Sequence, residues 1–238
     1  MTSIFSRVLW DLHSIVYDFK TSAVVHKDLQ EDIINELDFK GGELLLDAGI
    51  GTGALEIALL RRGISDIKVV GVDISTNMLK RAEKRLNHKF KDLELKRLNL
   101  NSPLPFPVNH FDAIACCNTF YTLYNHLAAL KEFYRILKPH GKIVLTTPHE
   151  RFKGTELMKY HYKKSEKLHH YLKAASESLL SIFLILPFEL LITIAEKKGE
   201  YKHLDEESMG KLFLQAGFNS HKIKLAYAEQ NWLVKAGK

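Results

Sequence analysis

The stretch LLLDAGIGTGALEIALL, Leu44 to Leu60, decides the fold of this chain of 238 residues. An apolar run ends at Asp47, three alternate glycines follow, and an apolar pattern with helical spacing starts at Leu55. This order predicts a strand, a tight turn and a helix. Glycine allows unusual backbone dihedrals and lets a ligand approach the chain closely. An anionic ligand group would lie at the start of the helix, where free N–H groups favour it.

The glycines alone leave the ligand open. Gly49, Gly51 and Ala54 fit the dinucleotide fingerprint G-x-G-x-x-G/A, and Asp73 lies near the distance at which that fingerprint has its ribose acid. The same residues, read from Asp47, also spell D-x-G-x-G-x-G, which is a different cofactor-binding pattern. The rest of the chain has to separate the two.

Length and composition indicate one substantial α/β unit, because 238 residues with 46% hydrophobic content are too few for two full domains with linkers. The two cysteines, Cys116 and Cys117, are adjacent. This excludes a disulfide framework and favours a reducing compartment, the cytoplasm. The first residues lack the features of a signal peptide.

The net charge of +6 is concentrated in one segment. Seven basic and two acidic residues lie between Arg151 and Lys173. A long apolar stretch follows at 179–194, so this segment does not read as the basic groove of a nucleic-acid-binding protein. Its histidines, His161, His169 and His170, lack a metal-ligand spacing, and no metal is expected.

Strands and helices alternate along the core of the chain. Residues 1–40 have helical spacing, and later helices are expected from Ser75 to Leu86, from Asn125 to Leu137 and from Asp205 to Gly217, with Pro139-His140-Gly141 as the break after the second. Apolar runs predict further strands at 67–73, 93–98, 111–117 and 142–148, and a closing hairpin from 221–228 and 230–236. Such alternation implies a parallel sheet with helices on both faces.

The order of four segments resembles the class I S-adenosylmethionine-dependent methyltransferases, and most closely the ubiquinone/menaquinone-biosynthesis type. The segments are DAGIGTG, VVGVDIS, LNLNSPLPFPVNHFDAI and FYRILKPHGKIVLTTP. The resemblance covers about residues 17–235 and implies a Rossmann-like α/β fold with a mostly parallel seven-stranded sheet, helices on both faces and a closing antiparallel hairpin. The dinucleotide alternative explains only the first two segments.

A single domain over 1–238 is expected on this resemblance. Its parts are an N-terminal helical cap at 1–40, a cofactor-binding core at 41–150, a helical substrate-lid insertion at 151–204, and a last helix with the hairpin at 205–238.

The resemblance implies S-adenosylmethionine as cofactor, with S-adenosylhomocysteine as product. Asp73 would accept both ribose hydroxyls, and Asp47 would reach towards the amino group. Asn99 stands where the family usually has the Asp that receives the adenine amino group. Tyr17, with the following Asp, resembles the family's Y-D pair in a helix over the cofactor. The full set of expected cofactor residues is Tyr17, Asp47, Gly49, Ile50, Gly51, Gly53, Asp73, Ile74, Asn99, Leu100 and Asn118.

The methyl group of this cofactor is already activated, so the enzyme mainly aligns acceptor and methyl carbon. Candidates near the reaction centre follow the strand at 111–117: Tyr121 and Tyr124, which could face the sulfonium or orient the acceptor, and His126, which could act as a base. Packing for the tyrosines and solvation at a helix start for the histidine are the alternatives.

The expected acceptor is a hydrophobic small molecule, with a lipid, a quinone or another prenyl-bearing compound as the leading class. The apolar stretch at 179–194 is shorter than the roughly 20 residues of a membrane-spanning helix. Together with the basic run before it, it predicts a lid that touches an anionic membrane face from the cytoplasm, or else a lid core or homodimer contact. The alternatives are a methyltransferase for a soluble aromatic or natural product, a non-catalytic cofactor-binding protein, and RNA modification, which the charge pattern disfavours.

Overall fold

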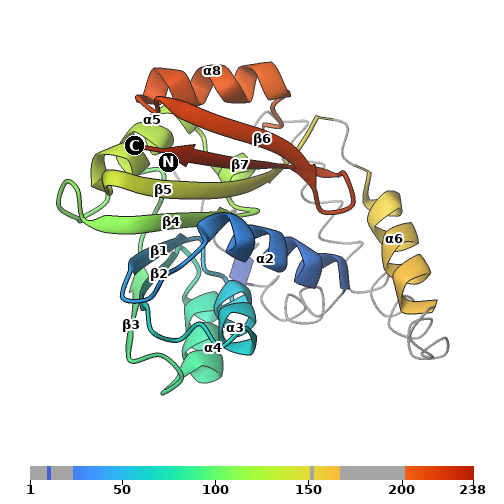
Figure 1. Ribbon diagram of the computed structural model, residues 1–238, viewed down its shortest axis with the longest axis horizontal. Coiled ribbons are helices and arrows are strands. Elements are labelled where there is room, and N and C mark those ends of the chain that lie inside the picture. The colour runs from blue at the N-terminus through green and yellow to red at the C-terminus, as the bar shows by residue number, and fades with distance from the viewer. Residues whose placement is uncertain (1–9, 12–23, 151–152, 167–201) are drawn as a thin grey trace.

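The computed structural model describes residues 10–11, 24–150, 153–166 and 202–238. Its centre is a seven-stranded sheet with the strand order β3-β2-β1-β4-β5-β7-β6, parallel except for the pairs β5–β7 and β7–β6 (Figure 1). The strands are β1 Leu44–Ala48, β2 Lys68–Asp73, β3 Asp92–Arg97, β4 Phe111–Cys117, β5 Leu137–Pro148, β6 Ser220–Ala226 and β7 Asn231–Gly237. This confirms the predicted Rossmann-like methyltransferase fold with its closing hairpin.

Helices cover both faces of this sheet (Figure 1). One hydrophobic core packs the sheet against α5 and α8, and the other packs it against α2, α3 and α4. The bounds are α2 Val24–Leu37, α3 Ala54–Arg61, α4 Thr76–Leu86, η1 Phe120–Thr122, α5 His126–Ile136, α6 Gly154–Glu166 and α8 Glu206–Ala216.

The predicted helix caps are confirmed where the sequence has short polar residues. Ser75, Asn125 and Asp205 each accept a hydrogen bond from a backbone N–H of the first helical turn, in α4, α5 and α8 respectively. Gly217 ends α8 in the left-handed conformation, with φ 106°. These local signals fix where the helices begin and end around the sheet.

Two boundaries differ from the sequence prediction. The strand predicted from Lys142 begins at Leu137, which pairs with Phe111 before the register shifts to the pair Lys142 and Ala113. The Pro139-His140-Gly141 segment therefore bulges within β5 and does not precede it. The hairpin turn is also longer than predicted, because residues 227–229 all have positive φ and carry the chain round between β6 and β7.

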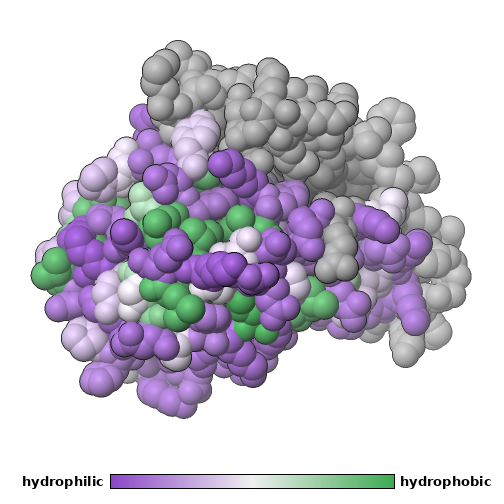
Figure 2. All heavy atoms as spheres, turned by 90° about the horizontal axis from the view of Figure 1, so that it is seen from above, coloured by the Kyte–Doolittle hydropathy of each residue, from purple (hydrophilic) through white to green (hydrophobic). Residues whose placement is uncertain are grey.

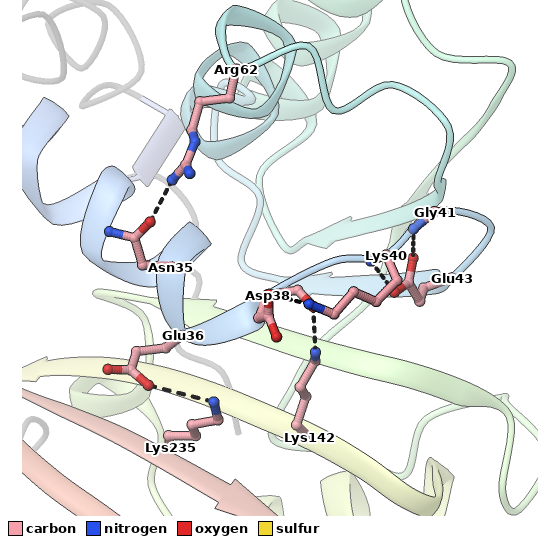
Figure 3. A network of polar contacts seen from close by, with 9 residues as sticks. All are labelled: Asn35, Glu36, Asp38, Lys40, Gly41, Glu43, Arg62, Lys142 and Lys235. Atoms are coloured by element: carbon pink, nitrogen blue, oxygen red, sulfur yellow. Dashed lines mark hydrogen bonds and ion pairs between the residues drawn. The ribbon is translucent and has the colours of Figure 1, made fainter.

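Polar contacts fix α2 to the half of the sheet that contains the hairpin (Figure 3). Glu36 of α2 lies 2.7 Å from Lys224 Nζ of β6 and 3.5 Å from Lys235 Nζ of β7. The hydrogen bond from Lys224 lowers the pKa of Glu36. Lys142 of β5 donates to the carbonyl oxygen of Asp38, just beyond α2, at 3.0 Å. Three strands are thus tied to one helix end.

Figure 2 shows the face that carries α8, where hydrophobic side chains lie among many hydrophilic ones. Leu214 of α8 and Leu225 of β6 are exposed by 56% and 46%. An open groove of about 560 Å³ runs between these two elements, and its lining residues are Glu206, Glu207, Gly210, Lys211, Leu214, His221 and Ile223. All belong to α8 and β6, so this groove is separate from the glycine-rich loop.

Candidate active site

The candidate site lies at the carboxyl ends of β2, β1 and β4, where the strand order reverses. Ligands of open α/β sheets bind at such a point. β1 stands between β2 and β4, so the loops after all three strands meet at one edge of the sheet. The predicted residues Asp73, Gly49 and Asn118 come from these loops or strand ends.

Hydrogen bonds to β2 hold the glycine-rich loop in place. The amides of Gly49 and Ile50 donate to the carbonyl oxygen of Val72, at 2.8 and 3.0 Å. The amide of Gly51 donates to Oδ2 of Asp73 at 3.0 Å. The Ser75 amide donates to Oδ1 of the same carboxylate at 2.8 Å. Each oxygen of Asp73 keeps lone-pair capacity for a further donor.

Gly49 is a place where only glycine fits. Its φ is 96°, and an added Cβ would lie 2.1 Å from Oγ1 of Thr119, which follows β4. The β1 and β4 loops therefore contact each other directly. Gly53 has φ 77° at the start of α3, and its added Cβ would lie 2.6 Å from Leu86 at the end of α4.

Three carboxyl groups gather beneath the loop. Asp47 at the end of β1 is 2% exposed, and Glu56 in the first turn of α3 is fully buried. Burial, with the neighbouring charges, raises the pKa of Asp47 well above its usual range, and burial raises that of Glu56 to about 7. Burial likewise raises the pKa of Asp73 to about 6. Acids with pKa values raised in this way hold protons readily, and a cationic ligand group would instead favour their charged forms.

Other expected cofactor residues have partners within the protein. The Asn99 side-chain oxygen accepts from the backbone amide of Asn101 at 3.0 Å, in a local turn. The Asn118 side-chain oxygen faces Thr146 of β5 and Asn231 of β7. The side chain of Ile50 packs over Gly71 in the core, Ile74 accepts from Arg97 through its carbonyl, and Leu100 is partly buried against the core. Tyr17 lies outside the described residues.

Of the three residues expected near the reaction centre, two are buried and one is more exposed. Tyr121 of η1 is 7% exposed and its ring lies 5.9 Å from that of His203. Tyr124 is 36% exposed, and its amide bonds Asn101. His126, the first residue of α5, is 7% exposed and stacks on Phe120 with ring centroids 4.5 Å apart.

His126 is held as a neutral imidazole. Burial lowers its pKa to about 4, with the positive charge of Lys202 acting in the same direction. Its Nε2 is buried and has no hydrogen-bond partner among the described residues. A histidine with this pKa is a weak proton acceptor at neutral pH.

Sequence reasoning did not identify several residues at this edge. Asp11 accepts a 2.5 Å hydrogen bond from Ser75 Oγ, two positions after Asp73. Leu204 accepts from Trp232 Nε1 at 2.9 Å, and the Lys202 amide donates to the Tyr121 carbonyl at 3.3 Å, so residues 202–204 contact η1 and the beginning of β7. Of the site residues that sequence reasoning missed, Glu56 is the one with a recognisable sequence signal, because it is an acid inside the apolar helix ALEIALLR.

Comparisons with known proteins agree with this geometry. A family model described as a methyltransferase domain matches residues 46–145. A demethylmenaquinone methyltransferase of Staphylococcus saprophyticus is 30% identical over 207 residues, covering 84% of this chain and 80% of that protein. The one from Oceanobacillus iheyensis is 29% identical over 212 residues, covering 84% and 79%. A solved S-adenosylmethionine-dependent methyltransferase from Aquifex aeolicus superposes with a TM-score of 0.59 at 22% identity, covering 87% and 88% of the two chains.

The fold, the loop and these matches define a class I S-adenosylmethionine-dependent methyltransferase. The chain belongs to the ubiquinone/menaquinone-biosynthesis type of this family, and it is an enzyme. S-adenosylmethionine is its cofactor. The residues fit that group, because Asp73 has acceptor capacity for a diol and the buried acids Asp47 and Glu56 suit its positive charge.

Two further observations bear on membranes and metals. Among the described helices none has both the length and the apolarity to span a bilayer. Within the same residues no three His, Cys, Asp or Glu side chains gather as metal ligands.

Proposed function

We propose that this methyltransferase acts on a hydrophobic quinone-type acceptor. The observation that carries the proposal is the 30% identity, over four fifths of its length, to a protein named for demethylmenaquinone. The cofactor supplies a methyl group bonded to a positively charged sulfur. The protein's part is to bind both partners, to exclude water and to align the acceptor atom with that methyl group.

The acceptor ring is proposed to lie beside η1. Aromatic and imidazole rings gather there at the carboxyl ends of β4 and β5: Tyr121 with His203, and His149 with Trp232, whose centroids are 5.7 Å apart. Flat apolar rings of this kind suit a planar ligand. In this proposal buried Tyr121 contacts the acceptor, whereas Tyr124, which is more exposed, stays outside the pocket.

His126, whose ring stacks on Phe120 of η1, is proposed to orient the acceptor through its buried Nε2. A neutral Nε2 can donate to, or accept from, an acceptor oxygen according to its tautomer. With its pKa near 4, His126 would position the acceptor and would not be the main proton acceptor.

Asp73 and the glycine loop are proposed to bind the cofactor. Gly51 fixes the Asp73 carboxylate, which would receive the ribose hydroxyls. The surroundings of the cofactor would be shaped by Gly49, Gly53, Ile50, Ile74 and Leu100. Asn118 would set the distance between the loop after β4 and strand β7, because its side-chain oxygen accepts a hydrogen bond from Asn231. The side-chain oxygen of Asn99 already accepts a hydrogen bond from the Asn101 amide, so the adenine amino group would be its second donor.

Radiolabelled methyl transfer tests the function directly. The enzyme is assayed with a short-chain demethylmenaquinone, in its oxidised and reduced forms, and with soluble catechol-type aromatics. We expect transfer to the quinone-type acceptor, with the methyl position located by mass spectrometry. Transfer to the soluble aromatics alone would favour the second class of acceptor, and binding of cofactor without transfer to any acceptor would favour a non-catalytic protein.

A matched pair of variants locates the acceptor. Tyr121→Phe should raise the KM for the acceptor, whereas Tyr124→Phe should leave it unchanged, and neither should change cofactor affinity. Equal effects of the two would contradict the proposed position of the acceptor.

The membrane-facing lid and a homodimer through it stay predictions, because residues 167–201 lie outside the described part of the chain. Flotation with anionic and neutral vesicles at low and high salt tests the first. Light scattering at several concentrations tests the second.

A further inference from the structure

Glu56 is a buried acid that the cofactor contacts expected from the sequence do not use. It is fully buried, and among the described residues its carboxyl group has no hydrogen-bond partner other than the carboxyl group of Asp47. Oδ1 of Asp47 is buried too, and Glu56 is its one side-chain partner there. Buried carboxyl groups are normally hydrogen-bonded, because leaving them unpaired costs several kcal/mol. Two buried acids that pair with each other can share one proton, and their remaining lone pairs can accept from a cationic ligand group.

Further ionisable groups surround this pair. Asp73 of β2 adds a third carboxyl group, and the thiols of Cys116 and Cys117 face Asp47 from β4. Asp11 in turn faces Asp73. Of these groups, Asp73 raises the pKa of Asp47 further through its negative charge, whereas the thiols, whose own pKa values burial raises, stay uncharged.

The cation that faces the pair is already engaged elsewhere. Arg85 of α4 favours the charged form of Glu56, but its Nη1 donates to the carbonyl oxygen and Oγ1 of Thr52, at 3.1 and 2.7 Å. Burial raises the pKa of both groups, and the charge of Glu56 raises that of Asp47 further, whereas the hydrogen bond with Asp47 limits the rise at Glu56. Near neutral pH the two carboxyl groups hold one proton between them.

We infer that Glu56 joins Asp47 as the receptor for the ammonium group of the cofactor's methionine part, and that the pair gives up its shared proton when this ammonium binds. The inference rests on the assignment of the cofactor. The carboxyl O–H bond breaks, the proton passes to water or buffer, no bond between heavier atoms changes, and the pair changes from one negative charge to two beside the new cation. Loss of the proton then becomes favourable, because an opposite charge stabilises both carboxylates.

Isothermal titration calorimetry in buffers of different ionisation enthalpy measures the released proton. Two ligands separate the groups: S-adenosylhomocysteine carries the ammonium, whereas 5′-methylthioadenosine shares its adenosine and thioether but lacks it. Between about pH 6 and 7.5, we expect release of a large fraction of a proton with S-adenosylhomocysteine. Binding of the ribose at Asp73 can also release protons. This release should be the same for both ligands, so the difference between the two ligands measures the release caused by the ammonium group.

Proton release also makes affinity depend on pH. The dissociation constant for S-adenosylhomocysteine should fall as the pH rises in this range, by up to about tenfold per unit. The constant for 5′-methylthioadenosine should change less. Equal proton release and equal pH dependence with both ligands would overturn the inference.

Glu56→Gln is the test variant, and Glu83→Gln is its control at an exposed position of α4. Glu56→Gln removes one of the two carboxyl groups that face the ammonium, so the dissociation constant for S-adenosylhomocysteine should rise by about tenfold or more, while Glu83→Gln should behave as wild type. An unchanged dissociation constant for S-adenosylhomocysteine in Glu56→Gln would contradict the role of Glu56. Affinity for 5′-methylthioadenosine should stay within twofold, which a general disturbance of the site would not allow.

A second measurement applies if Glu56→Gln does not fold. Infrared difference spectra of the wild-type protein should show loss of a protonated-carboxyl band when S-adenosylhomocysteine binds, and an unchanged band would refute the inference. Failure of the cofactor assignment itself looks different, because neither S-adenosylmethionine nor S-adenosylhomocysteine would then bind at all.

Discussion

The amide of Gly51 donates to Oδ2 of Asp73 at 3.0 Å and so joins the glycine-rich loop of β1 to the carboxyl end of β2. The two residues are 22 positions apart, and each belongs to a different motif of the sequence. Their contact makes one site of the two motifs. The Asp73 carboxylate is held at both oxygens, because Oδ2 accepts from the Gly51 amide and Oδ1 accepts from the Ser75 amide.

Asp73→Ala should weaken the binding of S-adenosylmethionine and S-adenosylhomocysteine alike. The variant removes the charged acceptor for the ribose and leaves the Gly51 amide without its partner. Hydrogen bonds to a charged group of this kind contribute about 2–3 kcal/mol, so calorimetry should show a roughly 30- to 150-fold higher dissociation constant. Asp73→Asn keeps an acceptor oxygen and should lose less. Tight NAD binding by the wild-type protein would contradict the assignment.

Gly49→Ala should destabilise the protein more than Gly42→Ala. Both positions have positive φ, but an added Cβ at Gly42 meets nothing within 4 Å, whereas at Gly49 it would strike Thr119. The backbone strain shared by both costs about 1–2 kcal/mol, and the clash adds about 1–3 kcal/mol at Gly49. Urea unfolding measures both. Equal losses would show that Thr119 can move aside.

Local sequence signals predicted most of the fold, because they act over a few residues. Ser75, Asn125 and Asp205 cap helices by bonding the next turn, and alternating strands and helices leave few topologies. The hairpin turn was harder, because Tyr227 and its two successors adopt positive φ without a glycine or asparagine. Contacts from His149 and Lys153 to this turn hold it, and such contacts are not local in sequence.

The cofactor end of the site was predictable in part for the same reason. Asp47, Gly49 and Asp73 stand in recognisable motifs, whereas the burial of Glu56 depends on how α3 packs on the sheet. The docking of Asp11 at Ser75 spans 64 positions of sequence, and no pattern encodes it. The helix or strand in which a side chain lies is therefore easier to predict from the sequence than the residues that the side chain contacts.

The stability of the cofactor-free protein should fall as the pH rises from about 5 to 8, through the contribution of Glu56. The pKa of this acid is about 7 in the folded protein against an ordinary 4.5, so the folded state binds more protons between these values. Stability from this group is complete below 4.5 and is lost as the pH rises through 7. The shift corresponds to about 3 kcal/mol at most.

Urea unfolding of the wild type and of Glu56→Gln at pH 5 and pH 8 isolates this contribution. The variant should gain stability relative to wild type at the higher pH, and Glu83→Gln should follow the wild type. A wild-type minus variant difference that does not change with pH would show that Glu56 is not protonated in the folded protein.

His126 should act in the opposite direction at lower pH. Its pKa is about 4 in the folded protein against an ordinary 6.5, because burial disfavours the charged ring beside Phe120. The unfolded state then binds more protons between these values, so stability from this group is present above 6.5 and is lost as the pH falls through 4. In His126→Phe, which keeps an aromatic ring against Phe120, the free energy of unfolding should become less pH-dependent, by about 3 kcal/mol between pH 4 and 7.

The ring signals of His126 in NMR spectra should remain those of a neutral imidazole down to about pH 5. If the ring instead protonates near pH 6.5 and kcat/KM falls with it, His126 is the proton acceptor of the reaction and not a residue that only positions the acceptor.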